Sequence, residues 1–193
     1  LCTDSAKVNR SSNFLYVSGR NQKLFLIKNG NIEQEYTIST GKTGFGDQRG
    51  SGKTPIGKLT ITEKVGAGLP DYTLLVGLKP VKKDGKYVQL FNCDAYSERI
   101  IGSIYKKVPN ALKKIIPGNL KNYLESLKNC EAHVLTRALV IDMSRGIYIH
   151  GTNMESNLGK PLSGGCIRMS NDDIKELYNI VPTGTPVYVN PSA

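Results

Sequence analysis

Short apolar or alternating runs, separated by glycine, proline and asparagine, dominate the first ninety residues of the chain. Asn29 and Gly30 stand between two of these runs, and an Asn-Gly pair favours the tight turn that joins antiparallel strands. The pattern therefore predicts a meander of β-strands. The expected strands cover residues 14–19, 23–28, 32–39, 54–62, 71–78 and 86–91.

The apolar period changes between residues 97 and 132, where apolar side chains recur at helical spacing. Leu112 and Ile116 share one side of such a helix, and lysines fill the opposite faces. Pro109 and Pro117 cut the stretch into short helices, because proline removes a backbone donor. We expect a helical insertion that packs on a β core, with lysines that either solvate an exposed face or grip an anionic ligand.

Strand patterns return after this insertion, and a last helix is expected near the end of the sequence. Ser170 and Asp173 have the spacing of a capping box at the start of that helix. The elements together predict an α+β fold, mainly β, in a single domain over residues 1–193. The later strands are expected at 133–142, 146–151 and 185–189, and the helix at 171–181.

Basic residues outnumber acidic ones, with 26 Lys and Arg against 16 Asp and Glu, which gives a formal net charge of +10. This excess favours a polyanionic partner, which could be nucleic acid, an anionic membrane surface or an acidic cell-wall polymer. A nucleic-acid binder is disfavoured because aromatic residues form only 7% of the chain and no nucleic-acid-binding motif is present. No apolar stretch approaches the roughly 20 residues that a transmembrane helix needs.

The four cysteines, Cys2, Cys93, Cys130 and Cys166, are far apart and form no C-x-x-C pair. This spacing disfavours a disulfide framework and a tetrahedral zinc site, and it leaves open whether Cys93 and Cys130 meet. Cys130 and His133 would share a face of a helix, but a single pair of this kind is weak evidence for a metal. We therefore expect no metal and no cofactor.

The glycine-rich stretch 44–55, GFGDQRGSGKTP, ends in a way that suggests a phosphate-binding loop, with Gly52, Lys53 and Thr54 in the order of that motif. The spacing excludes this interpretation, since the leading glycine would fall at the position of Asp47. A helix should follow such a loop, whereas a strand pattern follows here. Nucleotide binding is therefore not expected.

His150 ends an expected strand, and Cys166 follows 16 residues later on the expected loop before the last helix. The connecting residues are polar and contain glycine, so the chain can fold back and bring the two side chains together. A cysteine nucleophile needs such a neighbour, because the reactive thiolate is the minor form at neutral pH. Gly151 has no side chain, which allows its carbonyl to accept the second ring N–H of His150 and fix the tautomer.

Gly164 and Gly165 precede Cys166 and permit positive φ angles, which let successive backbone N–H groups converge on one point. They therefore predict an oxyanion hole. Arg168 offers a planar guanidinium, which suits a substrate with a free carboxylate near its reactive carbonyl. Each residue alone has an ordinary structural explanation as a turn, a core thiol or a solvated charge, but the combination favours a cysteine nucleophile.

The stretches IHGTN and SGGCIRMSN resemble the signature of the L,D-transpeptidase catalytic domain, a family of cysteine enzymes that act on bacterial peptidoglycan. That signature is His-Gly on a strand, a loop, and Ser/Thr-x-Gly-Cys followed by a hydrophobic residue and Arg or Asn. The Ser-Thr-Gly turn at 39–41 and the Thr-Pro-x-Gly segment at 54–57 are also similar to the family. The resemblance covers about residues 14–65 and 134–190 and implies a mixed β-sheet sandwich, with a C-terminal helix after the active-site cysteine.

The resemblance implies that Cys166, activated by His150, attacks the L-centre carbonyl of the third stem residue in a tetrapeptide, and that D-Ala leaves. Transfer of the acyl group to an amine gives a 3→3 crosslink, whereas transfer to water would make the protein an L,D-carboxypeptidase. Other residues would hold the oxyanion through their backbone or bind a carboxylate of the stem. These residues are Gly164 and Gly165 for the oxyanion, and Arg168 and Ser163 for the substrate.

Two features depart from the family. Many members have His where this chain has Gly164, and the insertion at 97–132 is larger than a minimal domain needs, so we expect a lid that narrows substrate choice. The implied location is extracytoplasmic, in the periplasm or cell wall, and the start at Leu1 leads us to expect that a targeting segment has been removed. The alternative of another class is a non-catalytic wall-binding module, in which Cys166 would have ordinary thiol reactivity.

Overall fold

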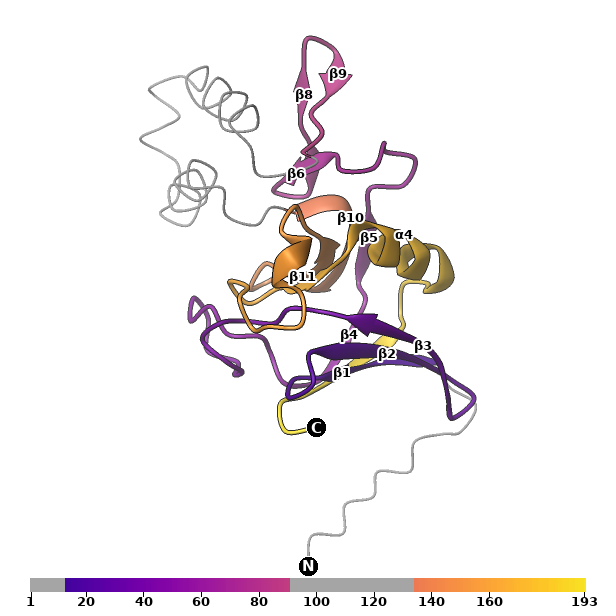
Figure 1. Cartoon of the computed structure of the whole chain (residues 1–193), viewed down its shortest axis with the longest axis vertical. Helices are drawn as coiled ribbons and strands as arrows, with labels where there is room; N and C mark the ends of the chain where they lie inside the picture. The colour runs from indigo at the N-terminus through magenta and orange to yellow at the C-terminus, as the bar shows by residue number, and fades with distance from the viewer. Residues whose placement is uncertain (1–12, 91–133) are drawn as a thin grey trace, which may run out of the picture.

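The computed structural model describes residues 13–90 and 134–193 (Figure 1). In these ranges β-strands predominate, with one α-helix, α4 (Asn171–Ile180), and a short 3-10 helix, η1 (Glu155–Asn157). The expected fold class, α+β with mainly β structure, is confirmed. The expected insertion at 97–132 and the cysteines other than Cys166 lie outside the described residues. The single-domain organisation stays a prediction.

The first sheet has five strands in the order β3-β2-β1-β13-β4. The expected turn between β2 and β3 is present, with φ angles of 52° at Asn29 and 82° at Gly30. β1 pairs with β13 in parallel, so that Leu15 lies opposite Val187 and the last strand completes the sheet. The strands are β1 (Phe14–Ser18), β2 (Lys23–Lys28), β3 (Asn31–Thr37), β4 (Gly57–Thr60) and β13 (Pro186–Asn190).

The second sheet has six strands, in the order β12-β11-β10-β6-β7 with β5 also paired to β10. β8 (Lys82–Lys83) and β9 (Lys86–Tyr87) form a separate hairpin, which projects from the body of the molecule (Figure 1). The strands of the second sheet are β5 (Glu63–Val65), β6 (Leu74–Val76), β7 (Lys79–Pro80), β10 (Val134–Asp142), β11 (Ile147–Gly151) and β12 (Ile167–Met169).

Four sequence predictions need correction. The strand expected at 86–91 is shorter, because only Lys86 and Tyr87 form β9 and Gln89 makes an isolated bridge to Thr73. The single strand expected at 54–62 is interrupted, because the Ile61 N–H donates to Thr185 in the first sheet while the Thr62 N–H donates to Val140 in the second. The run expected at 71–78 forms only the short strand β6, since the chain turns at Gly77 with a φ of 54°. β12 stands where a loop was expected, because three residues are too few to display an alternating pattern.

The apolar core lies between the two sheets, and α4 packs at their edge (Figure 1). Both sheets and the helix contribute side chains that are fully or almost fully buried, and each is worth about 1.5–3 kcal/mol when removed from water. In the described ranges, no helix is long and apolar enough to cross a bilayer. Core side chains include Leu15, Val17, Leu24, Leu139, Ile149, Ile167, Ile174 and Leu177.

Helix α4 follows the active-site segment and begins as the sequence predicts. The Ser170 side chain caps it, because its hydroxyl oxygen accepts the Asp173 N–H at 3.0 Å. The helix ends one residue earlier than expected, and Val181 is extended with a ψ of 127°. The following Pro182 accounts for this, since proline disfavours helical geometry in the residue before it.

Replacement of the helix cap should destabilise the fold. Ser170→Ala removes the acceptor for the Asp173 N–H and should lower the free energy of unfolding by about 0.5–2 kcal/mol in urea denaturation. Ser170→Asp keeps an acceptor at the same place and should retain most of the stability. Equal losses in the two variants would contradict the capping role.

Candidate active site

Two neighbouring strands, β11 and β12, place the candidate catalytic residues. They pair in parallel, with Ile149 opposite Ile167 and His150 opposite Arg168. Because successive side chains of a strand point to opposite faces, the two isoleucines enter the core while His150 and Arg168 lie on the other face. Cys166 directly precedes β12 and stands two residues before Arg168, so it shares that face.

His150 is buried, with 3% of its surface exposed. Its Nδ1 lies 2.7 Å from the carbonyl oxygen of Gly151, which is the contact expected from the sequence. A carbonyl can only accept, so Nδ1 carries the hydrogen and Nε2 of the neutral ring has the lone pair that can take up a proton. Gly151 must lack a side chain, because a Cβ there would lie 2.5 Å from Asn171 Oδ1 and 2.9 Å from the Leu135 carbonyl oxygen.

Backbone groups of β11 and of the turn before it surround the sulfur of Cys166. The Tyr148 N–H donates to Sγ at 3.4 Å, and the thiol donates to the Gly146 carbonyl oxygen at 3.5 Å. Cys166 is half-buried and is a free thiol. The sulfur is therefore held from two directions by backbone groups.

Burial raises the pKa of the Cys166 thiol above its usual value, because removal from water disfavours the thiolate. The Tyr148 N–H and the positive charge of Arg168 lower this pKa, but they offset only part of the effect of burial. The thiol is therefore protonated at neutral pH in this arrangement, and it needs a base to become a nucleophile. His150 on the same face is the candidate for that base.

The residues just before Cys166 form a tight turn. The buried Ser163 hydroxyl donates to the Cys166 carbonyl oxygen at 2.5 Å and accepts the Gly165 N–H at 3.0 Å. Gly165 has a φ of 121°, whereas Gly164 is exposed and no atom lies within 4 Å of the position that its Cβ would take. The burial of Ser163 favours a role in shaping the turn over the substrate contact expected from the sequence.

Arg168 lies at the accessible end of the same face. Its side chain is half-buried, and Nη1 donates to the Leu162 carbonyl oxygen at 3.1 Å. Its backbone N–H and carbonyl both bond to Ser39 at 2.9 Å, so the chain that leaves β3 pairs with the outer side of β12. The positive charge of the guanidinium lowers the pKa of the Cys166 thiol, and Arg168 lies on the same face two residues further along.

The sequence analysis missed residues that support this segment from the loops between β3 and β4. Thr54 is fully buried; its hydroxyl accepts the Gly41 N–H at 2.8 Å and donates to the Gly165 carbonyl oxygen at 2.9 Å. The Ser163 N–H donates to the Thr40 carbonyl oxygen at 2.8 Å. A signal was present, since these threonines belong to the Ser-Thr-Gly and Thr-Pro-x-Gly stretches that resemble the family.

Metal ligation finds no support in the described ranges, where no group of three or more His, Cys, Asp or Glu side chains could hold an ion. The candidate pair of Cys130 and His133 lies outside those ranges.

Comparison with known sequences identifies the family. The YkuD family model, described as the L,D-transpeptidase catalytic domain, matches residues 12–189. The chain belongs to this L,D-transpeptidase family. The match includes β11, β12 and α4, and it confirms the resemblance that the His-Gly and Gly-Gly-Cys stretches indicate.

Individual relatives match this L,D-transpeptidase domain over different lengths. A Bacillus licheniformis protein, named as the L,D-transpeptidase YkuD, is 58% identical over 43 residues, which are 22% of this chain and 26% of that protein. A solved L,D-transpeptidase from Mycobacterium smegmatis has a TM-score of 0.51 at 17% identity, over 93% of this chain and 58% of that one. A solved L,D-transpeptidase from Xylanimonas cellulosilytica has a TM-score of 0.51 at 16% identity, and the match covers 93% of this chain and 61% of that one. This chain therefore spans less than two thirds of each of these proteins, and the solved structures support its fold.

The two glycines before Cys166 should differ in their tolerance of a side chain in this L,D-transpeptidase domain. Gly165→Ala places a Cβ 3.1 Å from both Ile147 Cδ1 and the Lys53 carbonyl oxygen, at a positive φ. It should lower the free energy of unfolding by roughly 1–3 kcal/mol. The Cβ of Gly164→Ala has no atom of the described residues within 4 Å, so this variant should change the free energy of unfolding by less than about 0.5 kcal/mol. Urea denaturation measures both variants. A reversed order would contradict the geometry of the turn.

The pH dependence of Cys166 alkylation should report its raised pKa. Iodoacetamide labelling, followed by mass spectrometry of the Cys166 peptide between about pH 6 and about pH 11, should have a midpoint above the usual cysteine value of about 8.5. Arg168→Gln should move the midpoint higher still, because the guanidinium charge lowers the pKa. A midpoint near neutral pH in the unchanged protein would indicate a preformed thiolate and imidazolium pair instead.

Proposed function

We propose that this chain is a cysteine acyltransferase that acts on peptidoglycan stem peptides as an L,D-transpeptidase. The observation that carries the proposal is the placement of His150 and Cys166 on one face of β11 and β12, with His150 Nδ1 bonded to the Gly151 carbonyl. Adjacent strands lie about 4.8 Å apart and alternate residues about 6.6 Å apart along a strand. The two residues are thus diagonal neighbours, whose side chains can reach one another.

The first step is attack by Cys166 Sγ on the L-centre carbonyl of the third residue, a diamino acid, in a tetrapeptide stem. His150 Nε2 takes the thiol proton as the sulfur–carbon bond forms, which is necessary because the resting thiol is protonated. The carbonyl oxygen gains the negative charge. Backbone N–H groups of Gly164 and Cys166 hold that oxyanion, since the Gly165 N–H already donates to Ser163.

The second step releases D-Ala and leaves a thioester on Cys166. The carbon–nitrogen bond breaks, and the imidazolium of His150 gives its proton to the departing amine. An amine from a neighbouring stem then attacks the thioester and loses a proton to His150, which returns it to the sulfur. The product is a 3→3 crosslink, and the thiol is regenerated.

Arg168 is the proposed binding group for a carboxylate of the stem. Its guanidinium lies beside Cys166, and a planar fork can bind a carboxylate through two parallel hydrogen bonds. Binding at this place would hold the reactive carbonyl near the sulfur. The carboxylate also adds a negative charge that the basic chain attracts.

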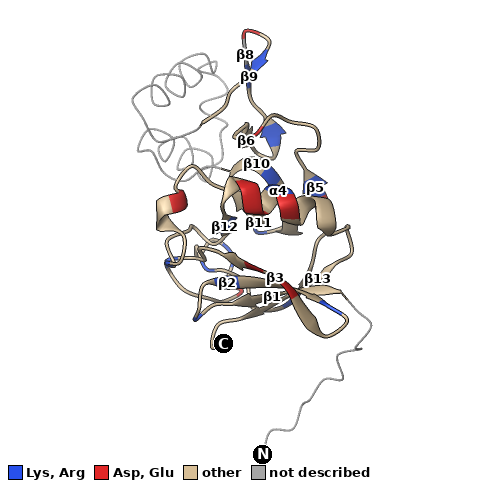
Figure 2. Ribbon diagram, turned by 45° about the vertical axis from the view of Figure 1, so that its right-hand side comes forward, with Lys and Arg blue, Asp and Glu red and all other residues tan. Residues whose placement is uncertain are grey.

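The proposed location is outside the cytoplasm, in the periplasm or cell wall, where peptidoglycan and its anionic polymers lie. The net charge of +10 favours such a partner. Lysines occupy both strands of the β8–β9 hairpin, which has an acidic residue at its tip, whereas acidic residues also occur on α4 and η1 (Figure 2). The hairpin lysines Lys82 and Lys86 are exposed, so they are available to a polyanion.

Cys166→Ala and His150→Ala should each abolish turnover, with losses of at least about 10³-fold in kcat. The double variant should be no worse than either single variant, because the two residues act as a unit. The measurement is mass spectrometry of a disaccharide-tetrapeptide after incubation with each protein. Circular dichroism of every variant serves as the control for folding.

The products decide between the candidate activities. Loss of D-Ala with a dimeric muropeptide supports transpeptidation, whereas a tripeptide without dimer supports the L,D-carboxypeptidase. Unchanged substrate with the unaltered protein would favour the non-catalytic wall-binding module. Near-normal rates in Cys166→Ala would remove the cysteine mechanism altogether.

A further inference from the structure

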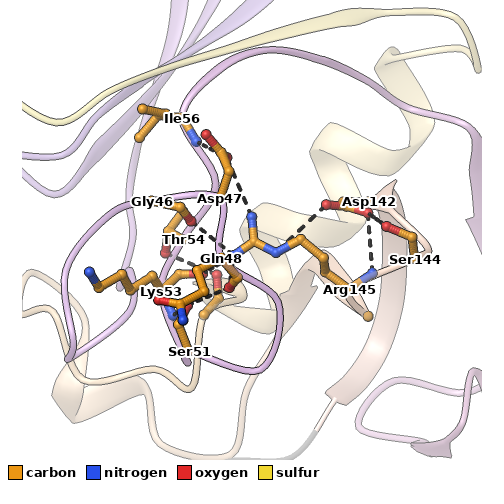
Figure 3. A network of polar contacts seen from close by, with 12 residues as sticks. Gly46, Asp47, Gln48, Ser51, Lys53, Thr54, Ile56, Asp142, Ser144 and Arg145 are labelled. Carbon is orange, nitrogen blue, oxygen red and sulfur yellow. Dashed lines mark hydrogen bonds and ion pairs between the residues drawn. The ribbon is translucent and has the colours of Figure 1, made fainter.

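Arg145, in the turn between β10 and β11, takes no part in the proposed reaction, yet its side chain is only 9% exposed. A guanidinium carries five N–H donors, and its burial is unfavourable unless those donors find acceptors. Its partners lie in two segments that are far apart in the sequence: Nη1 and Nη2 bond to the first, whereas Nε has no hydrogen-bond partner among the described residues and only an ion pair with the second. Figure 3 shows these segments on either side of the guanidinium.

The first segment is the glycine-rich loop 46–54. Arg145 Nη2 donates to the carbonyl oxygens of Gly46 at 2.9 Å and Lys53 at 3.0 Å. Nη1 lies 3.4 Å from Asp47 Oδ1 and forms an ion pair with it. One side chain therefore holds both ends of this loop at a single point.

The second segment is the turn that contains Arg145 itself. Asp142, at the end of β10, has Oδ2 3.9 Å from Arg145 Nε. Its Oδ1 accepts the Arg145 backbone N–H at 3.2 Å and the Ser144 hydroxyl at 2.7 Å (Figure 3). The same residue is thus fixed to the turn by its backbone and to the loop by its guanidinium.

Both segments lead directly to the groups that hold Cys166. On the loop side, Thr54 donates to the Gly165 carbonyl oxygen at 2.9 Å, and the Lys53 carbonyl lies so close that a Cβ on Gly165 would be 3.1 Å from it. On the turn side, the Gly146 carbonyl oxygen accepts the thiol of Cys166 at 3.5 Å. Movement of the loop against the turn would therefore displace the sulfur relative to the residues before it.

We propose that Arg145 is a positioning residue for Cys166: it locks loop 46–54 to the β10–β11 turn and so fixes both Gly165 and the Gly146 carbonyl, which accepts the hydrogen bond of the thiol. The expected effect of Arg145 on turnover rests on the proposed function. Lysine is a poor replacement for Arg145, because an ammonium has all its donors on one nitrogen, whereas Arg145 uses Nη2 for two carbonyl oxygens and Nη1 for the Asp47 carboxylate. Substrate binding is left to Arg168, since the Arg145 guanidinium is directed at groups of the chain itself.

Arg145→Lys should lower kcat for D-Ala release by about tenfold or more, because small misplacements of a nucleophile have large effects on rate. KM should change by less than about twofold, since no substrate contact is lost. The midpoint pH of Cys166 alkylation should fall toward the usual cysteine value, because a loosened turn admits water and withdraws the Gly146 carbonyl. Circular dichroism and thermal unfolding establish that the variant is folded at the assay temperature.

Two comparisons separate positioning from general damage. Arg49→Ala removes an exposed arginine from the same loop and should leave kcat and the alkylation profile unchanged. Methylguanidine added to Arg145→Ala should restore part of the lost rate, which a purely structural residue would not permit. If Arg145→Ala does not fold, Asp142→Asn serves instead, because it weakens the contact of Arg145 with the β10–β11 turn. It should lower kcat and the alkylation midpoint by smaller amounts than Arg145→Lys.

The alkylation profile needs no turnover, so the two proposals can fail separately. If the unaltered protein releases no D-Ala, the proposed function fails, while a lowered alkylation midpoint in Arg145→Lys still supports the positioning role. If the unaltered protein is active and folded Arg145→Lys retains both its kcat and its alkylation midpoint, the positioning role is overturned. A change of equal size in Arg49→Ala would overturn it as well.

Discussion

The parallel pairing of β11 with β12 is the constraint on which the rest of the site depends. It sets His150 opposite Arg168 and brings Cys166 to the same face. A shift of this register by one residue would turn Cys166 and Arg168 toward the core and expose the apolar side chains of β12. Those side chains, Ile167 and Met169, have no exposed surface, so the burial that stabilises the fold also protects the register. Core packing and catalytic geometry are therefore properties of the same short strand.

The electrostatic state of the site follows from this packing. The β12 position that aligns Cys166 also removes its sulfur from most of the solvent, and the pKa of the thiol rises as a result. A protonated cysteine is slow to react with oxidants and stray electrophiles, because the thiolate is the reactive form. In the proposed mechanism, reactivity arises only when His150 withdraws the proton toward a bound carbonyl. Burial thus protects the nucleophile at rest and assigns its activation to the imidazole.

Local patterns predicted the parts of the site that depend on neighbours in sequence. The alternation in β11, the contact between His150 and the Gly151 carbonyl and the cap at Ser170 all involve groups a few residues apart. Contacts between distant segments, such as Thr54 with Gly165 or Arg145 with the loop 46–54, have no local signal in the sequence. Threonine and arginine are usually exposed, so their burial here depends on tertiary partners that periodicity does not reveal. The division of the run 54–62 between two sheets was missed for the same reason.

The position of β13 has a consequence for how the chain acquires its structure. This strand lies between β1 and β4 and is the neighbour of both, although it comes from the other end of the sequence. Until residues 186–190 have been synthesised, the first sheet consists of two unconnected pieces, and β1 has only one of its two neighbouring strands. Pairings of such long sequence separation form slowly, because a large loop must close before any contact stabilises it. In a chain that is synthesised from its N-terminus, the first sheet therefore stays incomplete until β13 is available to pair with β1 and β4.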